Sequence, residues 1–101
     1  MKDIHDIFKE FKEEFPGVYQ KHARLGKEIH MESGPLEDKT RWLIKIAISG
    51  ASGHHRALKT HIEKAREAGV SEEEIKQVIL MLISTCGFPT AMEAYSTYKT
   101  K

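Results

Sequence analysis

Residues Trp42–Ala68 read WLIKIAISGASGHHRALKTHIEKAREA, and this stretch decides how the rest of the chain is interpreted. It begins as an almost unbroken apolar run, passes a Gly/Ser-rich break at residues 50–53, and continues as a charged amphipathic segment. His54 and His61 lie in the second half, seven residues apart. Seven residues are close to two helical turns, so both side chains are predicted to lie on the same helix face. If the chain has a reactive centre, we expect it at these two histidines.

The composition is that of one globular domain, residues 1–101, with 40% apolar and 31% charged residues. Sixteen basic and fifteen acidic residues are interspersed without a basic block, so nucleic acid is not an expected partner. The apolar runs are shorter than the roughly 20 residues that a bilayer span requires, so no membrane partner is expected either. The N-terminus is charged throughout and does not resemble a signal peptide, which makes the cytoplasm the expected location.

Cys86 is the only cysteine of the sequence. An intramolecular disulfide is therefore impossible, and the chain has no CxxC motif for redox or zinc chemistry. The favoured interpretation of Cys86 is a small buried hydrophobic residue. A reactive thiol is the alternative, although no cationic residue lies nearby in the sequence to favour the thiolate.

Hydrophobic periodicity predicts an all-α fold of about six helices without strands. The expected helices cover residues 4–15, 18–32, 37–51, 54–68, 71–85 and 89–99. We expect Asp3 to cap the first helix, Gly34 and Gly69 to end the second and fourth, and Ser71 and Glu74 to form a capping box. The third and fifth helices are apolar on more than one side, which predicts a central position or a subunit interface.

His61 lies in the middle of the predicted buried face of its helix, and His54 at the N-terminal end. A histidine in this setting is either a core residue satisfied by a hydrogen bond or a general acid/base. Metal binding is the weakest alternative, because seven helical residues separate the two histidines by about 10 Å and no third ligand is evident. His55 points to another face and is expected to be exposed. The 50–53 loop before a helix N-terminus is consistent with binding of a carboxylate.

The chain from Gly34 to Tyr98 resembles the carboxymuconolactone decarboxylase family, which includes the alkylhydroperoxidase D-like proteins. A weaker similarity precedes this region in the segment PGVYQKHARL. The resemblance implies an all-α helical bundle that assembles as a homo-oligomer, a trimer or hexamer, with sites near subunit contacts. Besides the GFPTA sequence of residues 87–91, the most specific matching positions are His61, Ala65, Gly69, Val70, Ser71, Glu74 and Ile75.

The peroxidase branch of this family carries a C-x-x-C-x-x-x-H motif and a glutamate twelve residues before the first cysteine. The corresponding positions here are His54, Ala57, His61 and Trp42, so only the histidine is retained. Without the dithiol there is no disulfide to cycle, and thiol-dependent peroxide reduction by that mechanism is not expected. Cys86 lies in the wrong segment to replace either cysteine.

The decarboxylase branch also lacks the two cysteines and keeps the histidine. The resemblance therefore implies a lyase that acts on a small carboxylated lactone without a cofactor or metal. In this hypothesis His61 donates the proton, while His54 and the helix N-terminus hold the carboxylate. The alternative is a non-catalytic oligomeric protein that binds a small acid or a partner protein.

Overall fold

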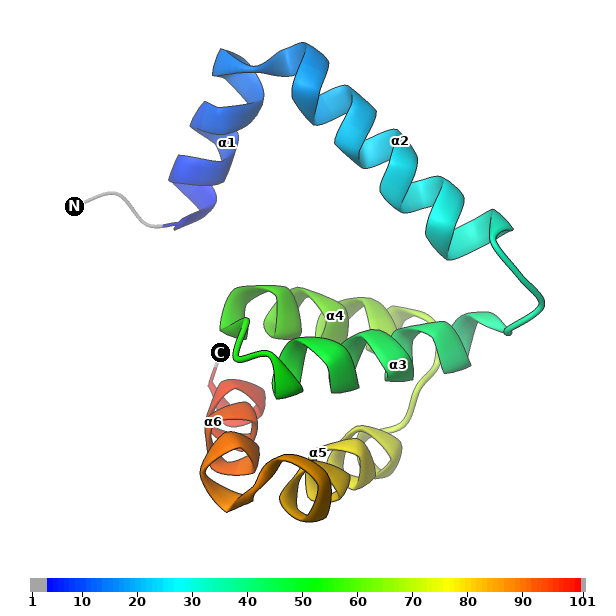
Figure 1. Cartoon of the computed structure of the whole chain (residues 1–101), viewed down its shortest axis with the longest axis vertical. Coiled ribbons are helices and arrows are strands. Elements are labelled where there is room, and N and C mark those ends of the chain that lie inside the picture. Colours follow the sequence, from blue (N-terminus) through cyan, green and yellow to red (C-terminus); the bar gives the residue numbers. More distant parts are fainter. Residues whose placement is uncertain (1–3, 101) are drawn as a thin grey trace. The chain divides into compact units, whose positions relative to one another are not determined.

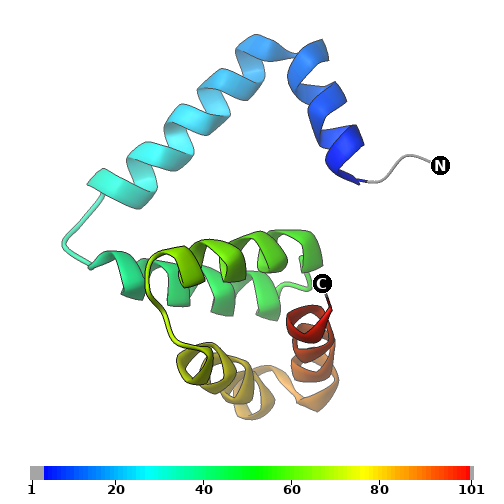
Figure 2. The same ribbon diagram turned by 180° about the vertical axis from the view of Figure 1, so that it is seen from behind.

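A computed structural model describes residues 4–100, with side chains from Asp6 onward, and consists of six helices (Figures 1 and 2). The described residues form no strand, and the predicted all-α fold is confirmed. None of the helices within this range combines the length and the hydropathy needed to cross a bilayer. The proposed cap Asp3 lies outside the described residues. The helices are α1 (Ile4–Glu14), α2 (Pro16–Glu32), α3 (Asp38–Ala51), α4 (His55–Glu67), α5 (Glu72–Cys86) and α6 (Phe88–Lys99).

The chain divides into two compact units, Met1–Pro35 and Leu36–Lys101. In the first unit only Phe15 separates α1 from α2, and α2 begins at Pro16 rather than at the predicted Val18. Proline suits the first position of a helix because its missing N–H would have no partner there. The Phe8 and Tyr19 rings pack edge to face with their centroids 5.7 Å apart, and this contact joins the two helices.

The second unit contains the core, where α3 and α4 run side by side in opposite directions (Figure 1). Helix α3 contacts α4, α5 and α6, which agrees with its predicted central position. Gly50 makes this packing possible, because a Cβ atom there would lie 3.0 Å from Leu82 Cδ1 and 3.6 Å from Ala94 Cβ. The buried core side chains are Ile46, Leu58, Ile62, Ala65, Val70, Ile75, Ile79, Leu82, Ala91 and Ala94.

The second apolar faces of α3 and α5 are exposed in the single chain. Ile48 on α3 is 60% exposed, and Leu80 and Met81 on α5 are 62% and 61% exposed. The predicted division of α5 between an inner and an outer apolar face is therefore present, with only the inner face covered within this chain.

The helix ends confirm two of the predicted caps. Ser71 Oγ accepts a hydrogen bond from the Glu74 amide at 3.1 Å, and the Glu74 carboxylate accepts one from the Ser71 amide at 2.8 Å. Gly69 has φ +92°, the left-handed conformation of a residue that follows a helix. Gly87, with φ +103°, is the only residue between α5 and α6.

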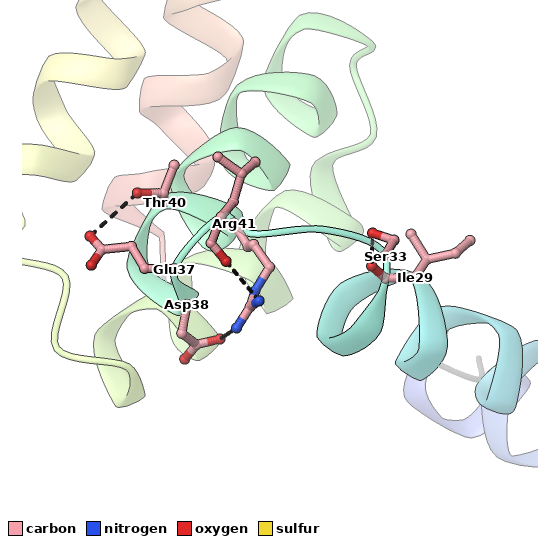
Figure 3. Close-up of polar contacts among 7 residues, drawn as sticks. Ile29, Ser33, Glu37, Asp38, Thr40 and Arg41 are labelled. Carbon is pink, nitrogen blue, oxygen red and sulfur yellow. Dashed lines mark hydrogen bonds and ion pairs between the residues drawn. The ribbon is translucent and has the colours of Figure 1, made fainter.

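The predictions for Gly34 and Cys86 are wrong. Ser33, in right-handed helical conformation, caps α2, and its hydroxyl donates to the Ile29 carbonyl (Figure 3). Gly34 therefore has no left-handed capping role, since positive φ among the described residues is confined to glycines 53, 69 and 87. Cys86 is exposed, because it ends α5 on a side away from the core.

The start of α3 is held by local side-chain contacts. Arg41 donates to the Leu36 carbonyl at 2.7 Å and lies 3.4 Å from the Asp38 carboxylate (Figure 3). The Thr40 hydroxyl lies 3.4 Å from the Glu37 carboxylate one turn away. Asp38 also places a negative charge at the positive end of the helix, as the sequence predicts.

A polar network joins α4, α5 and α6 at one end of the bundle. The Arg66 guanidinium makes two hydrogen bonds to the Glu72 carboxylate, at 2.9 and 2.8 Å. The Tyr98 hydroxyl donates to the same carboxylate at 2.8 Å. Hydrogen bonds from Arg66, then from Tyr98, lower the pKa of Glu72 from 4.5 to about 2.

Glu72→Gln is expected to lower the free energy of unfolding at pH 7 by about 0.5–1 kcal/mol, a small value because both charged side chains are partly exposed. The folded-state pKa lies below the unfolded one, so this stabilisation is complete above pH 4.5 and is lost as the pH falls toward 2. Chemical denaturation across this pH range measures the difference. Glu73→Gln, on the next residue, is the control, and a Glu72→Gln deficit that persisted undiminished at pH 2 would contradict the assignment.

Candidate functional site

His61 meets three side chains of α3 where α3 and α4 pack together. Trp42, Lys45 and Ser49 are spaced i, i+3 and i+7, which places them on one face of α3. His61 projects from the second turn of α4 toward this face and is half-buried. The four side chains, Trp42, Lys45, Ser49 and His61, are called the His61 cluster below.

The contacts of Nδ1 define which nitrogen of His61 carries the proton. Nδ1 lies 3.2 Å from Ser49 Oγ and 3.3 Å from the Lys45 carbonyl oxygen. A carbonyl only accepts, and the Ser49 hydroxyl donates its own hydrogen to the same Lys45 carbonyl at 2.7 Å. Both neighbours therefore present lone pairs to Nδ1, which favours the Nδ1–H tautomer. In the neutral ring Nε2 is then the basic nitrogen.

Lys45 is the only charged residue in the apolar run from Trp42 to Ala51. Its ammonium nitrogen lies 4.8 Å from the centroid of the Trp42 ring. Burial, and secondly the positive charge of Arg41 one turn earlier, lower the pKa of Lys45 from 10.5. Lys45 was not among the candidate site residues predicted from the sequence. A single charged residue within an apolar run could have indicated it.

Trp42 is the residue that stands where the peroxidase branch carries its glutamate. Its ring lies 5.9 Å from the His61 ring, centroid to centroid. The family resemblance thus indicated two positions whose side chains contact each other in this structure. The pair of an acid and a histidine expected of a peroxidase is replaced here by an aromatic ring and a histidine, with Lys45 supplying positive charge.

His54 lies at the N-cap position of α4 and is exposed, and its side chain makes no capping hydrogen bond. The backbone amide of His54 donates to the Ser49 carbonyl at 3.0 Å, and its carbonyl accepts from the Leu58 amide at 2.8 Å. A shallow depression of about 350 Å³ is lined by His54, His55, Arg56 and Ala57. The lining of this depression includes no residue of the His61 cluster.

His55 is exposed, as predicted, and faces α6. Its Nδ1 lies 3.1 Å from the Thr97 hydroxyl, and its Nε2 lies 3.7 Å from the Glu93 carboxylate. These two contacts connect His55 on α4 to side chains of α6. Within residues 4–100, no three His, Cys, Asp or Glu side chains gather in a group that could hold a metal ion.

The fold and the His61 cluster define a class of small all-helical protein with a histidine at a helix–helix contact and no dithiol. The model of the carboxymuconolactone decarboxylase family matches residues 16–99, and the chain belongs to this family. The resemblance inferred from the sequence motifs is therefore confirmed.

Two known proteins are similar to this chain. A carboxymuconolactone decarboxylase family protein from Legionella pneumophila, solved without ligand, superposes with a TM-score of 0.80 over 96% of this chain and 88% of its own, at 23% identity. An uncharacterized protein of Methanocaldococcus jannaschii is 29% identical over 83 residues, which cover 82% of this chain and 77% of that protein. The first similarity establishes the fold.

Ser49→Ala tests the assignment of the His61 tautomer. In the parent protein, ¹⁵N spectra are expected to show the neutral His61 ring protonated on Nδ1. The variant is expected to lose about 1 kcal/mol of stability, because the hydrogen bonds of the Ser49 hydroxyl to the Lys45 carbonyl and to His61 are removed. It should keep the same tautomer, since the Lys45 carbonyl remains as acceptor. A neutral ring protonated on Nε2 in the parent protein would contradict the assignment.

Proposed function

We propose that this protein is a cofactor-independent decarboxylase of small lactone or β-keto carboxylic acids, with His61 as its acid/base. The observation that carries the proposal is the fixed position of the His61 ring between two acceptors on Nδ1. Protonation on Nδ1 makes Nε2 the basic nitrogen of the neutral ring, and it also stabilises the imidazolium, because Nδ1–H keeps its acceptors when the ring is charged.

The reaction in this proposal converts R–COO⁻ and one proton into R–H and CO₂. The carbon–carboxylate bond breaks, and its electron pair moves into the adjacent carbonyl system. His61 takes a proton from solvent on Nε2 and delivers it to the carbon that lost the carboxylate. Lys45 lies in the same cluster and supplies positive charge for the negative charge that develops on the substrate oxygen.

The carboxylate itself has two candidate binding partners. Lys45 is favoured because it shares the Trp42 side chain with His61. His54 remains the candidate suggested by family position, together with the N-terminus of α4. Separate variants at the two positions distinguish them, since only the residue that holds the carboxylate should raise KM when it is replaced.

The active form in this proposal is a homo-oligomer, a trimer or hexamer. The supporting observation is the large apolar surface that the single chain leaves exposed on α3 and α5, including Ile48, Leu80 and Met81. Light scattering on the purified protein is expected to give a multiple of the 11.5 kDa chain mass. Leu80→Glu should reduce that mass, because it places a charge in the apolar face. A monomeric parent protein would contradict this part of the proposal.

A non-catalytic small-acid-binding protein is the second candidate. The observation that favours it is the same contact between His61 and the buried Ser49, because a structural histidine is satisfied in the same way. In that case the ring contributes stability, and His61→Ala is expected to lower the free energy of unfolding by about 1–3 kcal/mol. The two candidates differ in whether removal of Nε2 changes a reaction.

CO₂ release from a panel of lactone and β-keto carboxylic acids tests the proposal. The informative variant is His61→Asn, because the asparagine amide can still donate near the Nδ1 position while Nε2 is absent. We expect this variant to lose at least about 100-fold in rate, the usual contribution of a general acid/base. His55→Asn, an exposed histidine on the same helix, is the matched control and should retain the parent rate.

Release that survives in a folded His61→Asn protein would remove His61 from the mechanism. Release by none of the proteins, with the oligomer intact and the acids bound, would favour the second candidate.

A further inference from the structure

The surface between α4 and α6 carries a groove that the proposed decarboxylase chemistry does not use. A cavity of about 480 Å³ is lined by both helices, and a neighbouring cavity of about 400 Å³ shares Lys59, Thr97 and Thr100 with it. Both volumes lie in the range of small-molecule sites. Because the lining residues are shared, the two cavities form one continuous site, called the α4–α6 groove below.

One end of the groove is strongly cationic. The smaller cavity is lined by His55, Arg56 and Lys59 from α4, by Ser96 and Thr97 from α6, and by Thr100 just after it. No carboxylate is among these lining residues. Among the described residues, no ion pair joins Arg56 or Lys59 to an acid, whereas Lys64 on the same helix is paired with Glu67 at 3.7 Å. Two positive charges without partners, in a cavity with hydroxyls, favour an anionic group.

The other end of the groove has a different character. The larger cavity reaches Ile62, which is 2% exposed, and the half-buried Tyr98. Of the cations that line this end, Arg66 is bound to Glu72 through two hydrogen bonds, while Lys99 adds a positive charge and Glu63 a negative one. This end therefore suits the uncharged body of a ligand better than a second anionic group.

The spacing of the α4 residues fits this division. Arg56, Lys59, Glu63 and Arg66 follow one another at intervals of three, four and three residues, so they lie along a single face of the helix. The two cations without partners are at the N-terminal end of this row. A ligand that lies along the row thus meets the two unpaired cations at one end and Tyr98 at the other.

We propose that the α4–α6 groove binds a small organic anion, with the anionic headgroup between Arg56 and Lys59 and an apolar or aromatic body beside Tyr98. This site is independent of the His61 cluster and does not rest on the decarboxylase proposal. The headgroup is a phosphate monoester or a carboxylate, and the two are separated by the probes below.

The test uses the full chain, ¹⁵N-labelled and titrated at low salt with phenyl phosphate, benzoate and inorganic phosphate. Phenyl phosphate or benzoate is expected to shift the Lys59, Thr97 and Thr100 amides in a saturable manner. Inorganic phosphate should bind more weakly than phenyl phosphate, because it lacks the body. The tighter of phenyl phosphate and benzoate identifies the headgroup.

Lys59→Met should weaken binding about fivefold to tenfold, the effect of one partly exposed charged contact. Lys64→Met removes a charge from the same helix outside the groove and should leave the affinity unchanged. Equal weakening of binding by the two variants would mean that the net charge of the protein, and not a contact in the groove, causes the loss of affinity. That result would overturn the proposal. Saturable shifts confined to the Lys45 and His61 amides, or no saturable binding by any probe, would overturn it as well. A melting temperature for each variant confirms that it is folded.

Discussion

The close packing of α3 against three other helices is the constraint on which the second unit depends. Gly50 has no side chain to separate α3 from Leu82 and Ala94, and Ser49 beside it is buried with its hydroxyl hydrogen bonded within α3. The same closeness brings the His61 ring of α4 to Ser49 and to the Lys45 carbonyl. Core packing and the position of the candidate acid/base therefore have one cause, the small residues on the inner face of α3.

Local sequence signals predicted most of the fold. The apolar periodicity located all six helices, and Ser71 and Glu74 formed the capping box that their spacing indicates. The errors occurred where burial depends on distant parts of the chain. Cys86 has the composition of a core residue, but its place at the end of α5 leaves it exposed. Gly34 follows a helix that Ser33 already caps, so the presence of glycine did not indicate its conformation.

Only part of the candidate site could be predicted from the sequence, for the same reason. A histidine on the apolar face of α4 could be located by its spacing, but its partners come from α3 and required the structure. Lys45 lies 16 residues before His61, and only the packing of the two helices brings its carbonyl within 3.3 Å of Nδ1. The family supplies the fold and the retained histidine. With Cys86 as its single cysteine, the chain has no CxxC motif, the motif that the resemblance associates with the peroxidase branch.

The hydrogen bond between Tyr98 and Glu72 has a consequence for how the molecule fluctuates. Glu72 begins α5, Tyr98 lies in the last turn of α6, and Gly87 joins the two helices at their other ends. The α5–α6 pair is thus a helical hairpin whose open ends are joined by the Tyr98–Glu72 hydrogen bond. Arg66 of α4 binds the same carboxylate. Helix ends normally fray first, but here the two outer ends must separate from each other and from α4 at once. The hairpin therefore opens as a cooperative unit rather than residue by residue.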